Sequence, residues 1–409
     1  MKKTLIAAAV VILSALSFVL PETASAAPTF ARQTGMACNS CHFQHFPTLN
    51  AFGRAFKQGG YTMVGGQSLV EGDFLSLPSV LNASLITKVR YQKTNGDIDE
   101  SGTNKGELKF PDEAALLIGG RAGEHIGFLL EAQLGEPTAS AFASFKMPVV
   151  YKVAETDISV IPFKTDAAGA SYGYEVLNTG AVRMIRPIEH RSEMSAQQYI
   201  QTDGAATGVS FVAAQSMWFA NYTTWAHVDG TNDAGPYLHY LRAAVTPTVA
   251  GWDIGGGVQW WGGDTKHTAG TVREQANAWA IDAQAQGNAG NFPLGVYLSY
   301  GSAGKSKSAE FANIMNASTN KSRTAWAILG EIGVLPNRLT LTAGYRGGKN
   351  GDPSNNGKDN DTAATIGANY TLTQNVTFQW NTSWYSGDAY DPKPADGDQK
   401  TTLMLFAAF

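Results

Sequence analysis

Two cysteines and a histidine stand together near the start of the chain, and no other cysteine occurs in its 409 residues. Cys38, Cys41 and His42 form the pattern C-x-x-C-H, in which an imidazole directly follows the second thiol. Two thiols at this spacing can add to the vinyl groups of a haem, and the adjacent imidazole can bind the iron from one face. The motif therefore predicts one covalently bound c-type haem with His42 as an axial ligand.

Other uses of paired cysteines fit this sequence less well. A thioredoxin-like redox pair would need a surrounding βαβ pattern, and a structural zinc site would need a second pair of cysteines. A plain disulfide would leave the position of His42, next to Cys41, without a reason. Haem attachment accounts for all three residues.

The ligand on the second face of the iron stays open between Met63 and His45. Met63 lies 21 positions beyond His42, far enough for the chain to loop around a haem, and His/Met ligation would raise the reduction potential. His45 lies three positions after His42, on the same face of a helical stretch. His45 can instead bind a haem propionate, and Met63 can simply pack.

The first 26 residues have the pattern of a secretory signal peptide. Lys2 and Lys3 precede an apolar stretch from Leu5 to Leu20, and Ala24-Ser25-Ala26 offers a cleavage site. The apolar stretch is shorter than the roughly 20 residues that span a bilayer. The mature chain, with a net charge of about −5 once the leader is removed, has no feature typical of nucleic-acid binding.

Residues 27–78 form the expected haem segment. About 50 residues are too few to enclose a haem in an independent core, so this segment needs a second wall. A helix over residues 48–57 would place Phe52 and Phe56 on one face as an i, i+4 pair. Arg32 and Arg54 are candidates to pair with haem propionates.

Residues 79–409 have the pattern of a transmembrane β-barrel. The sequence contains 44 Gly, 9 Trp, 15 Tyr and 19 Phe with only 16% charged residues, as expected of a barrel with aromatic girdles. Phe378 and Trp380 alternate with Thr377 and Gln379, which predicts one lipid-facing and one lumen-facing side. No second stretch approaches 18 consecutive apolar residues, so any membrane role must use strands.

Such segments number sixteen, and the connections between them alternate between short turns and long polar loops. The alternation predicts that both ends of the barrel lie at the periplasmic rim, with the long loops outside. The expected strands are 79–92, 107–120, 126–134, 141–153, 157–165, 206–214, 217–227, 237–246, 251–261, 275–286, 292–302, 323–334, 338–347, 361–372, 375–386 and 399–409. The lumen of such a barrel is wide enough to hold the small haem segment as a plug.

The longest connection, residues 166–205, carries a mixed cluster of charges. Its charged residues are Arg183, Arg186, Glu189, His190, Arg191 and Glu193. Glu189, His190 and Glu193 could bind a metal ion, but their spacing is not diagnostic of a metal site. We expect a solvated outer loop, because surface loops are usually polar and mobile.

The haem segment also resembles a known family. The run from Pro28 to His42, followed by Phe46-Pro47, Phe52-Gly53-Arg54, Phe56-Lys57 and Gly60-Tyr61, resembles the fused monohaem cytochrome-porins of bacterial outer membranes. The best-known members oxidise extracellular ferrous iron. The resemblance implies a haem plug inside a barrel and electron transfer to periplasmic cytochromes. The spacer from Phe43 to His45 looks one residue longer than in the iron-oxidising members.

These patterns predict a cytochrome-porin in the outer membrane of a Gram-negative bacterium, with its haem segment on the periplasmic side or inside the lumen. Electrons would pass from an extracellular donor such as Fe(II) to periplasmic cytochromes, which would make the protein an iron(II) oxidase. Two alternatives stay open. The same route could export electrons to extracellular acceptors, or the barrel could be a diffusion porin with a structural haem.

Overall fold

The computed structural model describes residues 29–97, 104–134, 142–180, 193–230, 237–266 and 273–409. The expected signal peptide, residues 1–26, lies outside these ranges and stays a prediction. Within them, no helix is long and apolar enough to cross a membrane.

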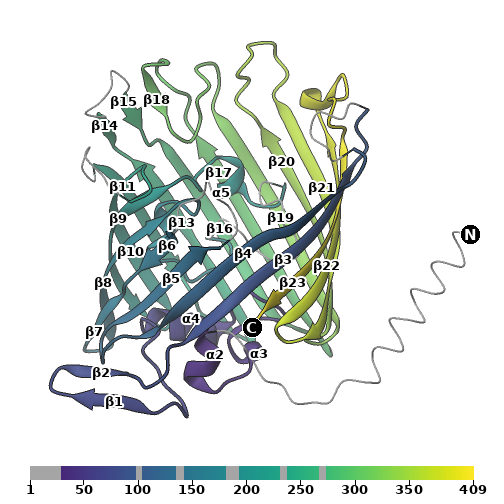
Figure 1. The fold of residues 1–409 in the computed structure, drawn as a ribbon. Coiled ribbons are helices and arrows are strands. Elements are labelled where there is room, and N and C mark those ends of the chain that lie inside the picture. Colours follow the sequence, from purple (N-terminus) through teal and green to yellow (C-terminus); the bar gives the residue numbers. More distant parts are fainter. Residues whose placement is uncertain (1–28, 98–103, 135–141, 181–192, 231–236, 267–272) are drawn as a thin grey trace, which may run out of the picture.

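The described strands close into one antiparallel barrel (Figure 1). They are β3 (Ala83–Thr94), β4 (Glu107–Arg121), β5 (Gly127–Gln133), β6 (Phe142–Lys146), β7 (Val149–Val153), β8 (Thr156–Thr165), β9 (Ala206–Gln215), β10 (Trp218–Ala226), β11 (Leu238–Val245), β12 (Thr248–Val249), β13 (Trp252–Gly262), β16 (Ala278–Ala289), β17 (Phe292–Ala303), β19 (Arg323–Leu335), β20 (Leu339–Lys349), β21 (Asn360–Thr373), β22 (Val376–Ser386) and β23 (Gln399–Ala408). Because β6 and β7 both pair with β8, and β11 and β12 both pair with β13, the barrel has sixteen strands over the described residues. The predicted fold class and strand count are confirmed.

Side chains alternate between the two faces of the wall as the sequence predicts. On β22, Phe378 is 41% exposed while its neighbours Thr377 and Gln379 are buried. The exposed side is rich in Trp, Tyr, Phe, Leu and Ile along the whole barrel, and the buried side carries Thr, Gln, Asn and Ser. This is the arrangement of a wall that has lipid outside and a polar lumen inside.

The barrel closes between its first and last strands. β23 pairs with β3, with Phe406 opposite Lys88, so both ends of the barrel lie at the end with the short turns (Figure 1). At the opposite end, the longer connections carry a small sheet of β14 (Asp264–Lys266), β15 (Arg273–Gln275) and β18 (Phe311–Asn313), and the short helix η3 (Asp388–Tyr390).

The segment before the barrel closes its short-turn end. It contains α2 (Thr29–Thr34), α3 (Cys38–Cys41) and α4 (Ala51–Gln58), and a hairpin of β1 (Leu69–Gly72) and β2 (Leu75–Pro78) (Figure 1). We call residues 29–66 the plug. It is bound to lumen-facing residues of the wall, for example through an ion pair of 2.5 Å between Arg54 and Asp253.

Helix α4 begins three residues later than the predicted helix over 48–57. Leu49 has extended backbone and forms a β-bridge with His42, so it cannot belong to the helix. The side chain of Asn50 then accepts a hydrogen bond from the backbone N of Gly53, which is the pairing of a helix N-cap.

The expectation of a solvated outer loop over residues 166–205 is wrong for residues 170–180 and 193–200. Residues 170–180 and 193–200 lie inside the barrel, where η1 (Ala170–Tyr172) and α5 (Ala196–Tyr199) are almost entirely buried. The physical reason is a buried charge network: Arg242 of the wall donates to Glu175 of this segment at 2.9 Å and to Asp282 of the wall at 2.6 Å. We call residues 173–180 the strap.

Candidate functional site

His42 ends the motif and begins a short hairpin that spans residues 42–49. Its backbone N donates to Cys38 O at 3.0 Å, which ends α3, and its backbone pairs with Leu49 across the hairpin. The ring Nδ1 lies 3.3 Å from Thr48 O, and since a carbonyl only accepts, Nδ1 is the donor. The imidazole is thereby fixed in one tautomer, with Nε2 left as the nitrogen that can bind a metal.

His42 is neutral in this setting. Burial lowers the pKa of its imidazole to about 4, although the carbonyl of Thr48 acts in the opposite direction. A neutral imidazole has the lone pair that a metal ion needs. Thus His42 meets both requirements of an axial ligand, a defined tautomer and an available nitrogen.

Cys38 and Cys41 are free thiols rather than a disulfide. Burial raises the pKa of both thiols, so they are protonated at neutral pH. The backbone N of Cys38 donates to the side chain of Gln374, at the turn between β21 and β22, at 2.9 Å. The motif is therefore tied to the wall as well as to the plug.

Both thiols and His42 open into one cavity between the plug and the barrel wall. It encloses about 550 Å³, within the range usual for small-molecule and cofactor sites. Its apolar walls include Phe30, Phe46, Phe56, Ile86, Leu117, Leu129 and Phe406. The structure thus brings together Cys38, Cys41 and His42, as the motif requires.

His45 does not belong to this cavity. Its Nε2 lies 2.5 Å from Glu331 of β19, its Nδ1 lies 3.2 Å from Phe46 O, and it is not among the cavity-lining residues. Both ring nitrogens are therefore engaged, which leaves none for iron or for a propionate. The structure gives His45 a different role, as an anchor between the plug and the wall.

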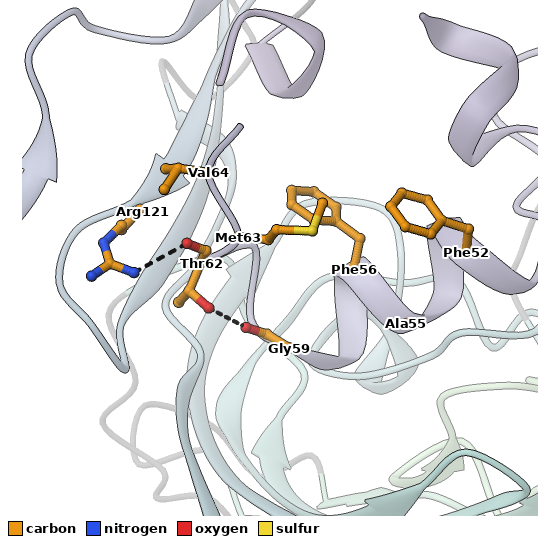
Figure 2. A pocket seen from close by; sticks show the side chains of 8 residues that line it. All are labelled: Phe52, Ala55, Phe56, Gly59, Thr62, Met63, Val64 and Arg121. Atoms are coloured by element: carbon orange, nitrogen blue, oxygen red, sulfur yellow. Dashed lines mark hydrogen bonds between the residues drawn. The ribbon is translucent and has the colours of Figure 1, made fainter. Parts of the chain in front are cut away.

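Met63 lies in a second, smaller pocket on the outer side of the plug. In Figure 2 its sulfur points toward the ring of Phe56, and Arg121 donates to Thr62 O nearby. Phe56 lines both pockets, whereas Met63 lines only the outer one. Because Met63 does not line the larger cavity, it is not placed as a ligand there.

Phe56 of the plug lines both pockets and Phe52 only the outer one, and Arg32 and Arg54 line neither, which the sequence did not indicate. Phe52 is 40% exposed and lines the outer pocket, so only Phe56 of the expected pair faces the larger cavity. Arg32 donates to Ala83 O, and Arg54 pairs with Asp253, so neither lines the cavity. The expectation that these arginines face the propionates is not met.

Sequence reasoning missed several residues that line the cavity or touch its walls. Met36 and Lys57 line it and are close enough to the motif in sequence to have been considered. Lys57 is the single Lys or Arg among the described residues that line the cavity. Burial lowers the pKa of its amine, and the charge of Glu175 in the strap partly offsets that lowering. Tyr172 also lines the cavity. It belongs to the part of the longest connection that lies inside the barrel, residues 170–180 and 193–200, which we call the inserted segment, and no sequence pattern indicated its position there.

The charged cluster of the longest connection is only partly described. Arg183, Arg186, Glu189, His190 and Arg191 lie outside the described residues. Glu193 is buried, bonds to Ser383 and Tyr385 of β22, and lies 3.2 Å from Lys400 of β23. No group of three or more His, Cys, Asp or Glu able to hold a metal ion occurs in the part of the chain that the structure describes.

The cavity fits a c-type haem. The two thiols, the available imidazole nitrogen and the aromatic walls line the same space, and Lys57 offers a cation for a propionate. These are the groups that such a cofactor needs for covalent attachment, iron ligation and exclusion of water.

The fold is that of a porin-like, closed antiparallel β-barrel. OmpF of Salmonella typhi has a TM-score of 0.50 at 10% identity, over 84% of this chain and all of that one. DcaP of Acinetobacter baumannii has a TM-score of 0.49 at 10% identity, over 80% of this chain and 97% of that one. A porin of Rh. blastica has a TM-score of 0.48 at 14% identity, over 81% of this chain and all of that one. Likeness at this identity concerns the fold alone. No family model and no curated protein matches the sequence.

Proposed function

We propose that this protein is an outer-membrane cytochrome-porin that carries one covalently attached c-type haem and transfers electrons across the membrane. One observation carries the proposal: Cys38, Cys41 and His42 open together into a single cavity of about 550 Å³ between plug and wall. A chance C-x-x-C-H on a surface would have no enclosed, largely apolar space beside it.

The residues around the cavity have separate tasks. Cys38 and Cys41 would hold the cofactor, and His42 would bind its iron through Nε2 while Thr48 O accepts the hydrogen bond of Nδ1. Phe30, Phe46 and Phe56 exclude water. A bound haem supplies a one-electron couple, so each electron taken from a donor outside reduces one equivalent of a periplasmic carrier.

Outer-sphere electron transfer moves no proton, so the reaction needs no general acid or base. The favoured donor is extracellular Fe(II), which loses one electron and becomes Fe(III), and the favoured acceptor is a periplasmic cytochrome. The plug lies at the short-turn end of the barrel, the end that faces the periplasm in barrels of this kind. That position supports delivery to a periplasmic carrier.

Two measurements on the purified protein test the proposal. The wild type should contain one haem that stays attached after denaturation, and a C38S/C41S variant should not. Ferrous citrate should then reduce the oxidised protein, seen as a change in the haem absorption bands.

Each result has a definite consequence. Lack of attached haem in the wild type would overturn the cytochrome assignment. A haem that no Fe(II) complex reduces at any pH would overturn the donor, and a strongly negative midpoint potential would favour electron export instead.

A further inference from the structure

The strap lies inside the barrel and contacts the plug through Asn178. Asn178 is buried at the point of contact, and its side chain binds both backbone groups of Leu49. The Leu49 N donates to Asn178 Oδ1 at 2.8 Å, and Asn178 Nδ2 donates to Leu49 O at 3.1 Å. This two-point attachment fixes the backbone of Leu49 as a neighbouring strand would.

Leu49 is the residue that pairs with His42 across the hairpin of the plug. The carbonyl of the preceding residue, Thr48, accepts the hydrogen bond of His42 Nδ1. Asn178 therefore acts one residue away from the carbonyl that orients the imidazole. The two hydrogen bonds between Asn178 and Leu49 are sufficient to hold this part of the hairpin in place.

Asn178 is itself held firmly by the barrel wall. Its backbone N donates to Gln284 Oε1 at 2.7 Å, and the hydroxyl of Thr179 donates to Asp282 Oδ1 at 2.7 Å. Gln284 and Asp282 belong to β16, a strand of the wall. A wall strand, the strap and the haem-binding hairpin thus form one connected chain of hydrogen bonds.

We propose that Asn178 is a positioning residue that sets the reduction potential of the haem through Leu49, Thr48 and His42. This inference rests on the proposed function. A firm Nδ1–H···O=C bond makes the imidazole a stronger electron donor to iron, which favours Fe(III) and lowers the potential. If the hairpin loosens, this bond weakens and the potential rises.

The test is a redox titration of full-length, haem-loaded N178A. We expect the Fe(II) form to be favoured by about threefold to tenfold more than in the wild type; tenfold corresponds to about 59 mV for a one-electron couple. The electron paramagnetic resonance signal of the oxidised iron should also change, because its shape depends on the orientation and basicity of the axial imidazole.

The matched control is N221A. Asn221 is also a buried lumen Asn that holds the same inserted segment, through Tyr174 O at 3.2 Å, but it does not touch the plug. Its removal should leave the potential unchanged. An equal shift in N221A would attribute the effect to general loosening of the segment and overturn the proposal.

A second variant, N178S, keeps a small polar group where N178A leaves none, and should shift the potential in the same direction. Failure of both position-178 variants to form a folded, haem-loaded barrel, while N221A does so, would show a purely structural role and overturn the inference. An unshifted potential in loaded N178A would overturn it too. A wild type without haem would instead overturn the proposed function.

Discussion

His42 and His45 are three residues apart and have opposite electrostatic surroundings. Burial lowers the pKa of His42 to about 4, and its near neighbours do not restore it. Burial also acts to lower the pKa of His45, but attraction to Glu331 and their hydrogen bond raise it overall. Burial thus favours the neutral form of His42, whereas Glu331 favours the charged form of His45.

Because His45 of the plug pairs with Glu331 of the wall, we expect the plug to loosen as the pH rises. Because the folded pKa of His45 is raised above its usual 6.5, the stabilisation is complete below about pH 6.5 and is lost as the pH passes the folded value. A hydrogen bond of this charged kind contributes roughly 1.5 to 3 kcal/mol. Limited proteolysis of the plug between pH 5.5 and 9 should show the change.

The control for this prediction is H45Q. The other groups that face the pair are His42, which stays neutral throughout this range, and Tyr297, whose hydroxyl donates to Glu331 at 2.5 Å. H45Q should be cut equally fast at all these pH values, while its haem spectrum stays that of the wild type. A pH dependence that survives in H45Q would assign the effect to another group.

The motif residues could be predicted from the sequence, whereas the roles of His45 and Met63 could not. Cys38, Cys41 and His42 are defined by local spacing, which any fold of the segment preserves. The role of His45 depends on Glu331, 286 positions away, and Met63 lies in a different pocket from the motif. Spacing along a chain carries no information on such partners.

At the scale of elements, α3 and α4 pack without room for an added methyl group. A Cβ at Gly53 would lie 2.1 Å from the carbonyl O of Cys41 and 3.1 Å from the side chain of Leu49. The close approach allows α4 to support the turn that carries both cysteines. Gly53 is therefore a packing requirement of the haem segment.

We expect G53A to impair haem loading. The two helices must move apart, at a cost of about 1 to 3 kcal/mol for overpacking of this kind, and the thiols shift with α3. The measurement is haem content per folded protein. G59A is the matched control, since a Cβ at Gly59 meets nothing closer than 3.5 Å; equal loading of the two variants would show that α3 tolerates the displacement.

The inserted segment is the element that sequence reasoning placed wrongly. Its length and polarity are those of an outer loop, and the default for such loops is solvent. What draws it inward is the pairing of Glu175 with Arg242 on β11. That pairing is buried and joins residues far apart in the sequence, so it could not be predicted from residues 166–205 alone.

At the scale of the whole molecule, the strand count and the location of both barrel ends at the end with the short turns were predicted correctly. Alternation of apolar and polar residues follows from lipid on one side and lumen on the other, so it is present in every strand separately. The alternation of short and long connections then fixes the direction of each strand. No long-range information is needed for either inference.

The plug from one end and the inserted segment from the other predict a barrel that small solutes cross poorly. Glu175 attaches the strap to Arg242, which also pairs with Asp282 of the wall, and His45 and Arg54 bind the plug to the wall. Liposomes containing the protein should therefore swell in small sugars nearly as slowly as protein-free liposomes. Liposomes with an open general porin are the positive control, and equally fast swelling would favour the diffusion-porin alternative.

The cavity has a consequence for the order of assembly. Its walls come from residues as far apart as Thr29 and Ala408, so the enclosure is complete only after the last strand has joined the first. A cofactor bonded through Cys38 and Cys41 must be installed while that enclosure does not yet exist. Under the proposed function, the plug would thus be loaded first, and the pairing of β23 with β3 would then close the barrel around it.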